Sequence, residues 1–326
     1  MRSSATWRLR TRTLELGPRT LIMGVVNITP DSFSDGGWYL RPEMAAARAL
    51  QLLEEGADLI DLGAESTRPG SRAGGAAPAV HPNNKDPLLG APAVHPNNKE
   101  PLLGAPAVNA EEELARLLPV IERILQVQPD AILSVDTYKA RTARAALAAG
   151  AEAINDVSGF TWDSGLAQVC AEAHAGVVLT HTRGRPEEWR TQPQLSPGEL
   201  LATVREGLAR SLAAAETAGI SPQAVLLDPG YGFGKRFDEN YALVARQREL
   251  LALGRPLLAG VSRKSFLGHT LAPLFAGSPA PVDARETASL AAMTAAILNG
   301  ASVIRAHAVR PALEAARIAD AILEAS

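Results

Sequence analysis

Apolar and polar positions alternate in two periods along the chain, and together they predict a repeating series of strands and helices. Short apolar runs that stop at a polar residue are typical of strands buried in a parallel sheet. The longer stretches between them read as helices, several closed by a glycine. The predicted strands are 21–26, 57–63, 131–136, 153–157, 176–181, 224–228, 256–262 and 301–307. The predicted helices are 43–55, 110–126, 138–149, 163–174, 198–218, 239–252, 284–298 and 310–325.

Eight strand–helix units in a chain of 326 residues predict an α/β fold, a closed (β/α)8 TIM barrel in a single domain. An open, doubly wound sheet is the alternative, because periodicity alone does not establish closure. The first barrel strand is not followed by a Gly-x-Gly-x-x-Gly turn, which argues against a dinucleotide site. Residues 7–16 alternate apolar and polar before Gly17-Pro18, so residues 1–20 are predicted to hold an N-terminal β-hairpin.

Residues 73–108 depart from this pattern because they contain a tandem duplication. The segment 77–90 recurs at 91–104 with a single difference, Asp86 in the first copy and Glu100 in the second. Several prolines in each copy exclude a helix or a central strand. We therefore expect a disordered, exposed insertion in the loop after the second barrel strand. His81 and His95, which the duplication repeats, are interpreted as exposed side chains and not as metal ligands.

Composition narrows the class of protein. A formal net charge of -3 and a pI near 6.1 give no nucleic-acid or membrane footprint. The start, MRSSATWRLR, has no apolar segment of a secretory signal. The single cysteine, Cys170, excludes an intramolecular disulfide and fits a reducing compartment. These features predict a cytoplasmic protein with no nucleic-acid or membrane partner.

Every predicted barrel strand ends in a hydrogen-bonding or charged residue. In chain order these are Asn27, Asp61 with Glu65, Asp136, Asn155 with Asp156, His181, Asp228, Ser262 with Lys264, and Arg305 with His307. Any one of them could cap a helix or form an ion pair. Because barrel active sites lie at the carboxyl ends of the strands, we expect these groups to converge on one cavity.

The chemistry of these residues indicates a divided site. Asp136, Asn155 and Asp228 offer acceptors and one amide donor, which suits a planar heterocycle with an amino group and a ring N–H. Lys264, Arg305, His307 and Arg68 supply cationic donors, and the arginine fork suits phosphate. The sequence therefore predicts one part for a polar ring and another for an oxyanion.

Seven motifs, in order, closely resemble the dihydropteroate synthase family. They are NITPDSFSDGG (27–37), GAESTRPGS (63–71), SVDT (134–137), INDVSG (154–159), LLDPGYGFGK (226–235), GVSRKSF (260–266) and RAH (305–307). The resemblance covers nearly the whole chain from about residue 20, apart from the duplicated insertion. It implies condensation of 6-hydroxymethyl-7,8-dihydropterin diphosphate with p-aminobenzoate, giving 7,8-dihydropteroate and pyrophosphate. It also implies Mg2+ as cofactor and a homodimer.

The resemblance also assigns roles to matching positions. It implies catalytic roles for Asp35, Arg68 and Lys264. The implied pterin-binding residues are Asp136, Asn155, Asp228, Phe233, Gly260, Lys264 and Arg305. The implied diphosphate-binding residues are Asn27, Thr67, Arg305 and His307, with Asn27 also binding Mg2+. The residues implied to enclose p-aminobenzoate are Phe33, Asp35, Thr67, Arg68, Pro69 and Ser265.

One departure and three rival functions accompany this resemblance. Thr182 stands where the family usually has Met, so an apolar contact beside the pterin is expected to be missing. A pterin-dependent methyltransferase would not need both the 27–37 and 63–71 motifs, and a metal-dependent barrel hydrolase would carry His-x-His after the first barrel strand. A catalytically silent pterin-binding paralogue is the third alternative. The intact Asn27, Arg68 and Asp228, with Lys264, Arg305 and His307, argue against it.

Overall fold

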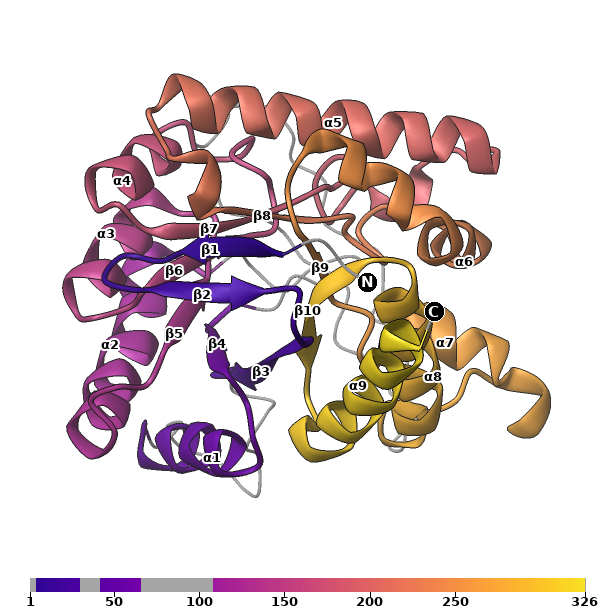
Figure 1. The fold of residues 1–326 in the computed structure, drawn as a ribbon, viewed down its shortest axis with the longest axis horizontal. Coiled ribbons are helices and arrows are strands. Elements are labelled where there is room, and N and C mark those ends of the chain that lie inside the picture. The colour runs from indigo at the N-terminus through magenta and orange to yellow at the C-terminus, as the bar shows by residue number, and fades with distance from the viewer. Residues whose placement is uncertain (1–3, 30–41, 66–107, 326) are drawn as a thin grey trace, which may run out of the picture.

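The computed structural model describes residues 4–29, 42–65 and 108–325, and its centre is a closed barrel of eight parallel strands (Figure 1). The strands are β3 (Leu21–Asn27), β4 (Leu59–Gly63), β5 (Leu133–Asp136), β6 (Ala153–Asp156), β7 (Gly176–Thr180), β8 (Val225–Asp228), β9 (Leu257–Ala259) and β10 (Ala301–Ala306). β10 pairs with both β3 and β9, which closes the barrel. The predicted TIM barrel is confirmed and the open sheet is excluded.

Helices surround the barrel, as predicted from the sequence. They are α1 (Pro42–Glu54), α2 (Ala110–Val127), α3 (Ala140–Ala148), α4 (Leu166–Glu172), α5 (Pro197–Thr217), α6 (Phe237–Arg246), α7 (Ser265–Thr270), α8 (Glu286–Leu298) and α9 (Val309–Glu324). Their starts follow local rules. Ser196, for example, begins α5 with a capping box, in which its hydroxyl accepts from Glu199 N and the Glu199 carboxylate accepts from Ser196 N.

Three elements differ most clearly from the prediction. The single helix expected at 239–252 is divided into α6 and a 3-10 helix, η3 (Gln247–Leu253), which ends at Gly254 with φ of 73°. The strand expected at 256–262 is shorter, because only Leu257–Ala259 pair with neighbouring strands. The short helix α7 was not predicted, since six residues with a central Gly268 carry too little periodicity.

Alternate strand residues face either the surrounding helices or the barrel interior. In β3, Ile22 and Val26 join the cluster packed under the helices, whereas Leu21 and Met23 join the cluster inside the barrel. The same period of two continues along the other strands. It fixes which polar residue at each strand end can reach the interior.

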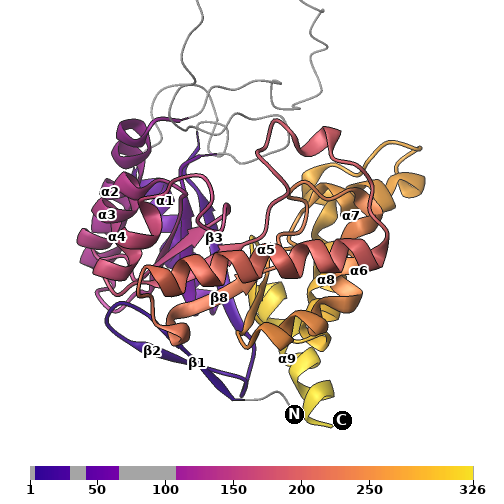
Figure 2. The same ribbon diagram turned by 90° about the horizontal axis from the view of Figure 1, so that it is seen from above.

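A two-stranded hairpin closes the barrel at the amino ends of its strands, which we call the base (Figure 2). It consists of β1 (Ala5–Arg8) and β2 (Thr13–Leu16), and it confirms the predicted hairpin. Its side chains Trp7, Leu9 and Leu16 are buried among the first residues of the barrel strands. Trp7 Nε1 also donates to Ala224 O at 3.0 Å.

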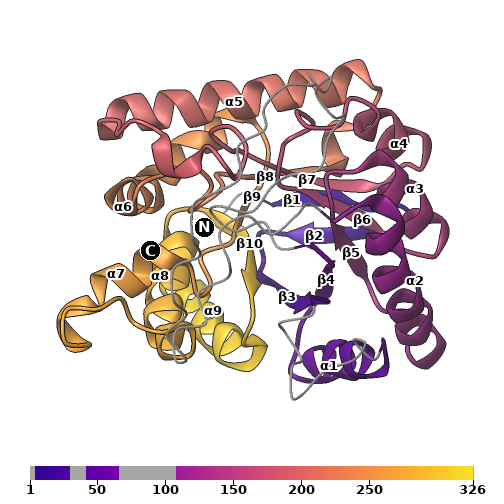
Figure 3. The ribbon, with the colours of Figure 1, turned by 180° about the vertical axis from the view of Figure 1, so that it is seen from behind.

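The opposite end, which we call the mouth, carries the carboxyl ends of the strands (Figure 3). It is the end at which the polar residues singled out in the sequence follow the strands. Within the described part of the chain, no helix is both long enough and apolar enough to span a bilayer.

Candidate active site

Strand register alone places three of the predicted site residues, together with Gly63, in one row at the mouth. Asn27 pairs with Gly63, Gly63 with Asp136, and Asp136 with Asn155 in the parallel ladders β3–β4–β5–β6. A Cβ added at Gly63 would lie 3.6 Å from Asp136 Cβ and 3.7 Å from Asn27 Oδ1. The glycine therefore brings the Asn27 amide and the Asp136 carboxylate close together across it.

Asp61 is the centre of a buried hydrogen-bond network below this row. Its side chain is 0% exposed, and Oδ1 accepts from Ser134 Oγ at 2.7 Å. Oδ2 accepts from Asn155 Nδ2 at 2.9 Å and from Arg305 Nε at 2.6 Å. Arg305 Nη2 donates in turn to Asp136 Oδ2 at 2.9 Å. Asp61 thus orients both the amide and the guanidinium that the sequence predicted as binding groups.

The other half of the mouth is built on the loops after β8 and β9. Asp228 Oδ1 accepts from Gly230 N at 2.7 Å, and Oδ2 would lie 3.5 Å from a Cβ added at Gly260. Lys264 Nζ lies 3.8 Å from the centroid of the Phe233 ring, a cation–π distance. Side chains from β8, its following loop and the loop after β9 therefore meet at one place.

The remaining predicted residues in the described part of the chain lie at the same end of the barrel. His307, directly after β10, has Nδ1 3.0 Å from Ser262 Oγ. Ser265 is the exposed first residue of α7, next to Lys264. The structure thus brings together Asn27, Asp136, Asn155, Asp228, Phe233, Gly260, Lys264, Arg305 and His307 at the mouth.

Burial shifts the pKa values of the charged groups at the mouth toward neutral pH. It raises the pKa of Asp136 to about 7, although Arg305 opposes this, and it also raises the pKa of Asp228, which the N–H of Gly230 opposes. Burial lowers the pKa of Lys264 to about 8 against the attraction of Asp228. Asp136 and Lys264 therefore change their protonation state close to neutral pH, as groups in binding and catalytic sites often do.

The expectation that all strand-end polar groups converge on the mouth is wrong for three of them. Because side chains alternate between the two faces of a strand, Asp156 points away from the barrel interior. Its carboxylate accepts from the backbone N–H groups of Ser158 and Phe160 at 2.8 and 2.6 Å. His181 is also turned outward, against Gly207 of α5. Glu65 instead pairs with Lys139, and its Oε1 accepts from Val108 N at 3.2 Å. These three residues hold loops and helices in place.

Several sequence predictions lie outside the described residues. They are Phe33, Asp35, Thr67, Arg68, Pro69 and the duplicated insertion up to residue 107. The chain ends on either side of residues 66–107 are nevertheless described. Since Glu65 accepts from Val108 N, the chain leaves and re-enters the barrel at adjacent points.

Thr182 forms two polar contacts within the loop after β7. Its hydroxyl donates to Gly184 O at 2.9 Å and accepts from Trp189 Nε1 at 3.0 Å. The Trp189 ring packs against Phe233 with centroids 5.1 Å apart. An aromatic side chain from the same loop therefore supplies apolar surface behind Phe233, which the sequence reasoning missed.

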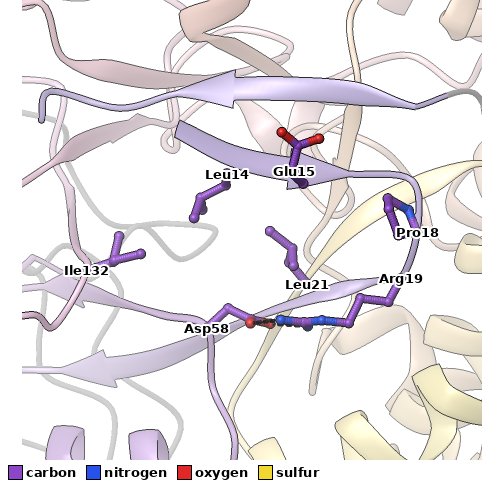
Figure 4. A pocket seen from close by; sticks show the side chains of 7 residues that line it. All are labelled: Leu14, Glu15, Pro18, Arg19, Leu21, Asp58 and Ile132. Carbon is purple, nitrogen blue, oxygen red and sulfur yellow. Dashed lines mark hydrogen bonds and ion pairs between the residues drawn. The ribbon is translucent and has the colours of Figure 1, made fainter. Parts of the chain in front are cut away.

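A hollow of about 420 Å³ lies at the base, far from these groups (Figure 4). It is lined by Leu14, Glu15, Pro18, Arg19, Leu21, Asp58 and Ile132. Its one charged pair is structural, because Asp58 Oδ2 accepts from both Arg19 Nη1 and Ile22 N at 2.8 Å. The pair fastens the start of β3 to the chain before β4, so the chemistry of the mouth has no counterpart here.

The donor set at the mouth fits Mg2+ held mainly by a substrate. No group of three His, Cys, Asp or Glu residues arranged to hold a metal occurs among the described residues. Asn27 offers a single hard amide oxygen at the end of β3. Mg2+ keeps several waters and commonly takes one or two protein oxygens together with substrate phosphates. One amide oxygen at the mouth is compatible with that arrangement.

Asp61 was predicted from the sequence only as one of the strand-end groups that converge on the cavity, and Ser134, Trp189 and Lys235 were not predicted as site residues. A signal existed for Asp61, because an acid in the otherwise apolar strand LIDLG must find buried partners. Lys235 closes a glycine-rich turn and is only 7% exposed, which a lysine in sequence does not reveal.

Comparison with known proteins places the chain among folate enzymes. Residues 23–80 and 98–307 match the family model described as pterin binding enzyme. The dihydropteroate synthase of Mycobacterium leprae is 37% identical over 93% of this chain and 94% of its own length. The chain also matches 55% of the length of the folate synthesis bifunctional protein of Pisum sativum, at 34% identity over 95% of this chain.

Solved structures give the same relationship. The dihydropteroate synthase of Xanthomonas albilineans, solved with 4-aminobenzoic acid, has a TM-score of 0.78 and 37% identity, covering 98% of this chain and 99% of that one. The Yersinia pestis dihydropteroate synthase, solved with a sulfonamide drug complex, has a TM-score of 0.79 and 34% identity, with the same coverage of both chains.

Proposed function

The chain belongs to the pterin binding enzyme family as a dihydropteroate synthase, and we propose that its mouth condenses 6-hydroxymethyl-7,8-dihydropterin diphosphate with p-aminobenzoate. The products are 7,8-dihydropteroate and pyrophosphate. The observation that carries the assignment of residues is the connected set at the mouth. In this set Asn155 and Arg305 donate to Asp61, and Arg305 also donates to Asp136. Asp228 and Arg305 both lie within 4.0 Å of the Cβ position at Gly260.

The pterin ring is held by the groups that offer paired donors and acceptors. The carboxylates of Asp136 and Asp228 accept from the exocyclic amino group and ring N–H groups, and the Asn155 amide can both donate and accept. Lys264 supplies a cation at a ring acceptor. Gly260 and Phe233 line the flat faces, because one has no side chain and the other is planar. Arg305 binds the substrate where the pterin ring is joined to the diphosphate.

The diphosphate is held by cationic donors from the end of the barrel. Arg305 has five N–H donors, and its bonds to Asp61 and Asp136 use two of them, which leaves donors for an oxyanion. His307 lies beyond β10 with its ring fixed by Ser262. Asn27 would hold Mg2+, which when bound supplies charge neutralisation to the leaving pyrophosphate. Thr67 joins this set on the family resemblance.

The reaction replaces one bond to the pterin methylene carbon with another. The bond from that carbon to the diphosphate oxygen breaks, its electron pair leaves with pyrophosphate, and the p-aminobenzoate nitrogen forms the new bond and releases a proton. An arylamine is unprotonated at neutral pH, so the site needs no strong general base. Arg305 and His307 stabilise the charge that grows on the departing oxygen.

The order of bond breaking follows from the acids around the ring. Carboxylates at Asp136 and Asp228 stabilise positive charge on the pterin, which favours departure of pyrophosphate before the amine attacks. A secondary deuterium isotope effect at the methylene carbon clearly above unity is expected. A value near unity would contradict a dissociative step.

The p-aminobenzoate side of the site rests on the family resemblance, because most of its residues lie outside those described. Phe33, Thr67, Arg68 and Pro69 would enclose the ring, with Asp35, Arg68 and Lys264 in the catalytic roles of the family. Ser265, exposed at the start of α7, would contact the carboxylate. The protein would act as a cytoplasmic homodimer, a state that sedimentation measurements would test.

A pyrophosphate-release assay tests this function directly. The account predicts release that requires both the pterin diphosphate and p-aminobenzoate, and that stops when EDTA removes Mg2+. Release without p-aminobenzoate would indicate hydrolysis. Pterin binding without any release under these conditions would indicate a silent paralogue. Asp228→Asn serves as the inactive reference, and Arg310→Ala, in an exposed pair with Glu314 on α9, as the neutral one.

A further inference from the structure

Lys235 is a buried lysine at the mouth to which neither the resemblance nor the comparisons assign a role. It ends the turn LLDPGYGFGK between β8 and α6, and it is only 7% exposed. Its Nζ donates to three backbone carbonyl oxygens, those of Gly230 at 2.8 Å, His181 at 3.0 Å and Phe233 at 3.3 Å. An ammonium group has three N–H donors, so the three acceptors match its full capacity.

These three carbonyls belong to two loops that approach each other too closely for side chains. A Cβ added at Gly230 would lie 1.9 Å from His181 O, and one added at Gly234 would lie 2.7 Å from Arg183 O. Both glycines have positive φ, 74° and 69°. Lys235 therefore joins the loop after β7 to the glycine-rich turn after β8.

The turn that Lys235 holds also carries two groups of the pterin site. The N–H of Gly230 donates to Asp228 Oδ1 at 2.7 Å and so sets the orientation of that carboxylate. Phe233, whose carbonyl Lys235 binds, presents its ring to Lys264 Nζ at 3.8 Å. Movement of this turn would displace Asp228 and Phe233 together.

We propose that Lys235 is a positioning residue for the pterin: its ammonium fixes the turn after β8, and the turn fixes the Asp228 carboxylate and the Phe233 ring. The inference rests on the proposed function, since it assigns the turn to the pterin half of the site. Burial lowers the pKa of Lys235 to about 7 against the attraction of Asp228. A lysine so costly to bury is consistent with a specific task for its charge.

The first test is Lys235→Met, which keeps the length of the side chain and removes its donors. We expect the KM and dissociation constant for the pterin diphosphate to rise at least tenfold, while the KM for p-aminobenzoate stays within twofold. Lys139→Met is the matched control, because Lys139 is also a buried lysine but its Nζ binds the carboxylates of Glu65 and Glu113. Equal loss of pterin affinity in both variants would overturn the proposal.

The second test restores the amine chemically. Lys235→Cys is made in a Cys170→Ala background, which removes the one native cysteine, and the unfolded chain is alkylated with bromoethylamine and refolded. The product carries an amine at the length of lysine. Pterin affinity should fall at least tenfold in the unmodified variant and return to within threefold of the Cys170→Ala parent after alkylation.

The two outcomes separate this inference from the proposed function. If the unmodified cysteine variant binds pterin like its parent, or if the alkylated, folded protein recovers no affinity, Lys235 has no positioning role. Absence of turnover in the unaltered protein would instead contradict the proposed function. A role in folding alone would change the unfolding midpoint and move the KM values of both substrates together.

Discussion

The two ends of this barrel differ in the polarity of their side chains. At the base, Trp7, Leu9 and Leu16 of the hairpin fill the interior with apolar side chains that are at most 1% exposed. At the mouth, the same strands end in carboxylates, amides and cations, and Asp61 alone accepts three hydrogen bonds from side chains. One chain thus closes the barrel by apolar burial at one end and leaves a polar binding surface at the other.

Stability and recognition are divided between the two ends of the barrel. Apolar burial at the base is favourable for folding, roughly 25 cal/mol per Å² removed from water. Burial at the mouth raises the pKa values of Asp136 and Asp228 and lowers that of Lys264, so their charged forms are less favourable there than in water. The mouth therefore sacrifices stability for a preorganised site, and substitutions at the two ends should have different consequences.

Asp61→Ala should have the largest effect, because Asp61 contributes both to the stability of the folded chain and to the orientation of the pterin-binding groups. Removing it leaves Arg305, Asn155 and Ser134 without their shared acceptor. We expect a loss of about 3–5 kcal/mol in the free energy of unfolding, and at least a hundredfold loss of pterin affinity. Urea unfolding and pterin titration check the two effects. Asp61→Asn, which keeps the shape, should lose less stability, and an unchanged midpoint in Asp61→Ala would contradict the network.

Trp7→Ala should reduce stability without changing recognition. The substitution empties a buried site at the base and removes the bond to Ala224 O. We expect a cost of about 3–5 kcal/mol in the free energy of unfolding, as for other large-to-small changes in a core. The pterin dissociation constant of the folded protein should stay within twofold. Trp7→Phe is the control, since it keeps most of the apolar volume and should lose much less.

The pH dependence of pterin affinity should have two limbs. Asp136, with a pKa of about 7, loses its acceptor charge as the pH falls, and Lys264, with a pKa of about 8, loses its ammonium as the pH rises. Lys235, with a pKa of about 7, also loses the ammonium that fixes the turn after β8 as the pH rises. Affinity should therefore be greatest near pH 7, fall by up to about tenfold per pH unit on the acidic side and fall more steeply on the basic side. Titration calorimetry across pH 5–10 checks this, and Asp136→Asn should remove the acidic limb.

The same carboxyl has an opposite effect on folding. The folded protein keeps the Asp136 proton up to about pH 7, whereas the unfolded chain releases it near the ordinary value of 3.8. The folded state therefore binds more protons in this window, and the contribution of Asp136 to stability falls as the pH rises from about 4 to about 7. A contribution that rose across this window would contradict the raised pKa.

The smallest effect is expected at neither end. Arg310 and Glu314 form an exposed pair one helical turn apart on α9, with side chains 66% and 65% exposed. Arg310→Ala should change the free energy of unfolding by less than about 0.5 kcal/mol. Turnover should be unaltered. A large effect on either would show that the surface contributes more than the division between base and mouth allows.

Much of the fold could be predicted from periodicity, because most buried strands are largely apolar on both faces and several helices are followed by a glycine. Period two also held information that the sequence reasoning did not use. Counting from Val178, which faces the interior, the parity of β7 places His181 outward, and the same count from Ala153 places Asp156 outward. A polar residue at a strand end therefore predicts a site residue less well than a polar residue whose position in the strand also directs it to the interior.

From the sequence, the site could be predicted only for residues that a local pattern or motif identifies. Asp136, Asn155 and Asp228 lie in the last two residues of strands that the periodicity of the sequence predicts. The central place of Asp61 and the contacts of Lys235 depend on neighbours 244 and 54 residues away in the chain. Such long-range contacts arise from barrel closure, and no local pattern encodes them.

The most direct test measures pterin binding and unfolding on the same three proteins, the unaltered chain, Trp7→Ala and Asp228→Asn. The account predicts that Asp228→Asn loses at least a hundredfold in pterin affinity while its free energy of unfolding stays within about 1 kcal/mol, because the isostere relieves a buried charge. Trp7→Ala should show the reverse. If Asp228→Asn binds pterin as tightly as the unaltered chain, the mouth is not the pterin site.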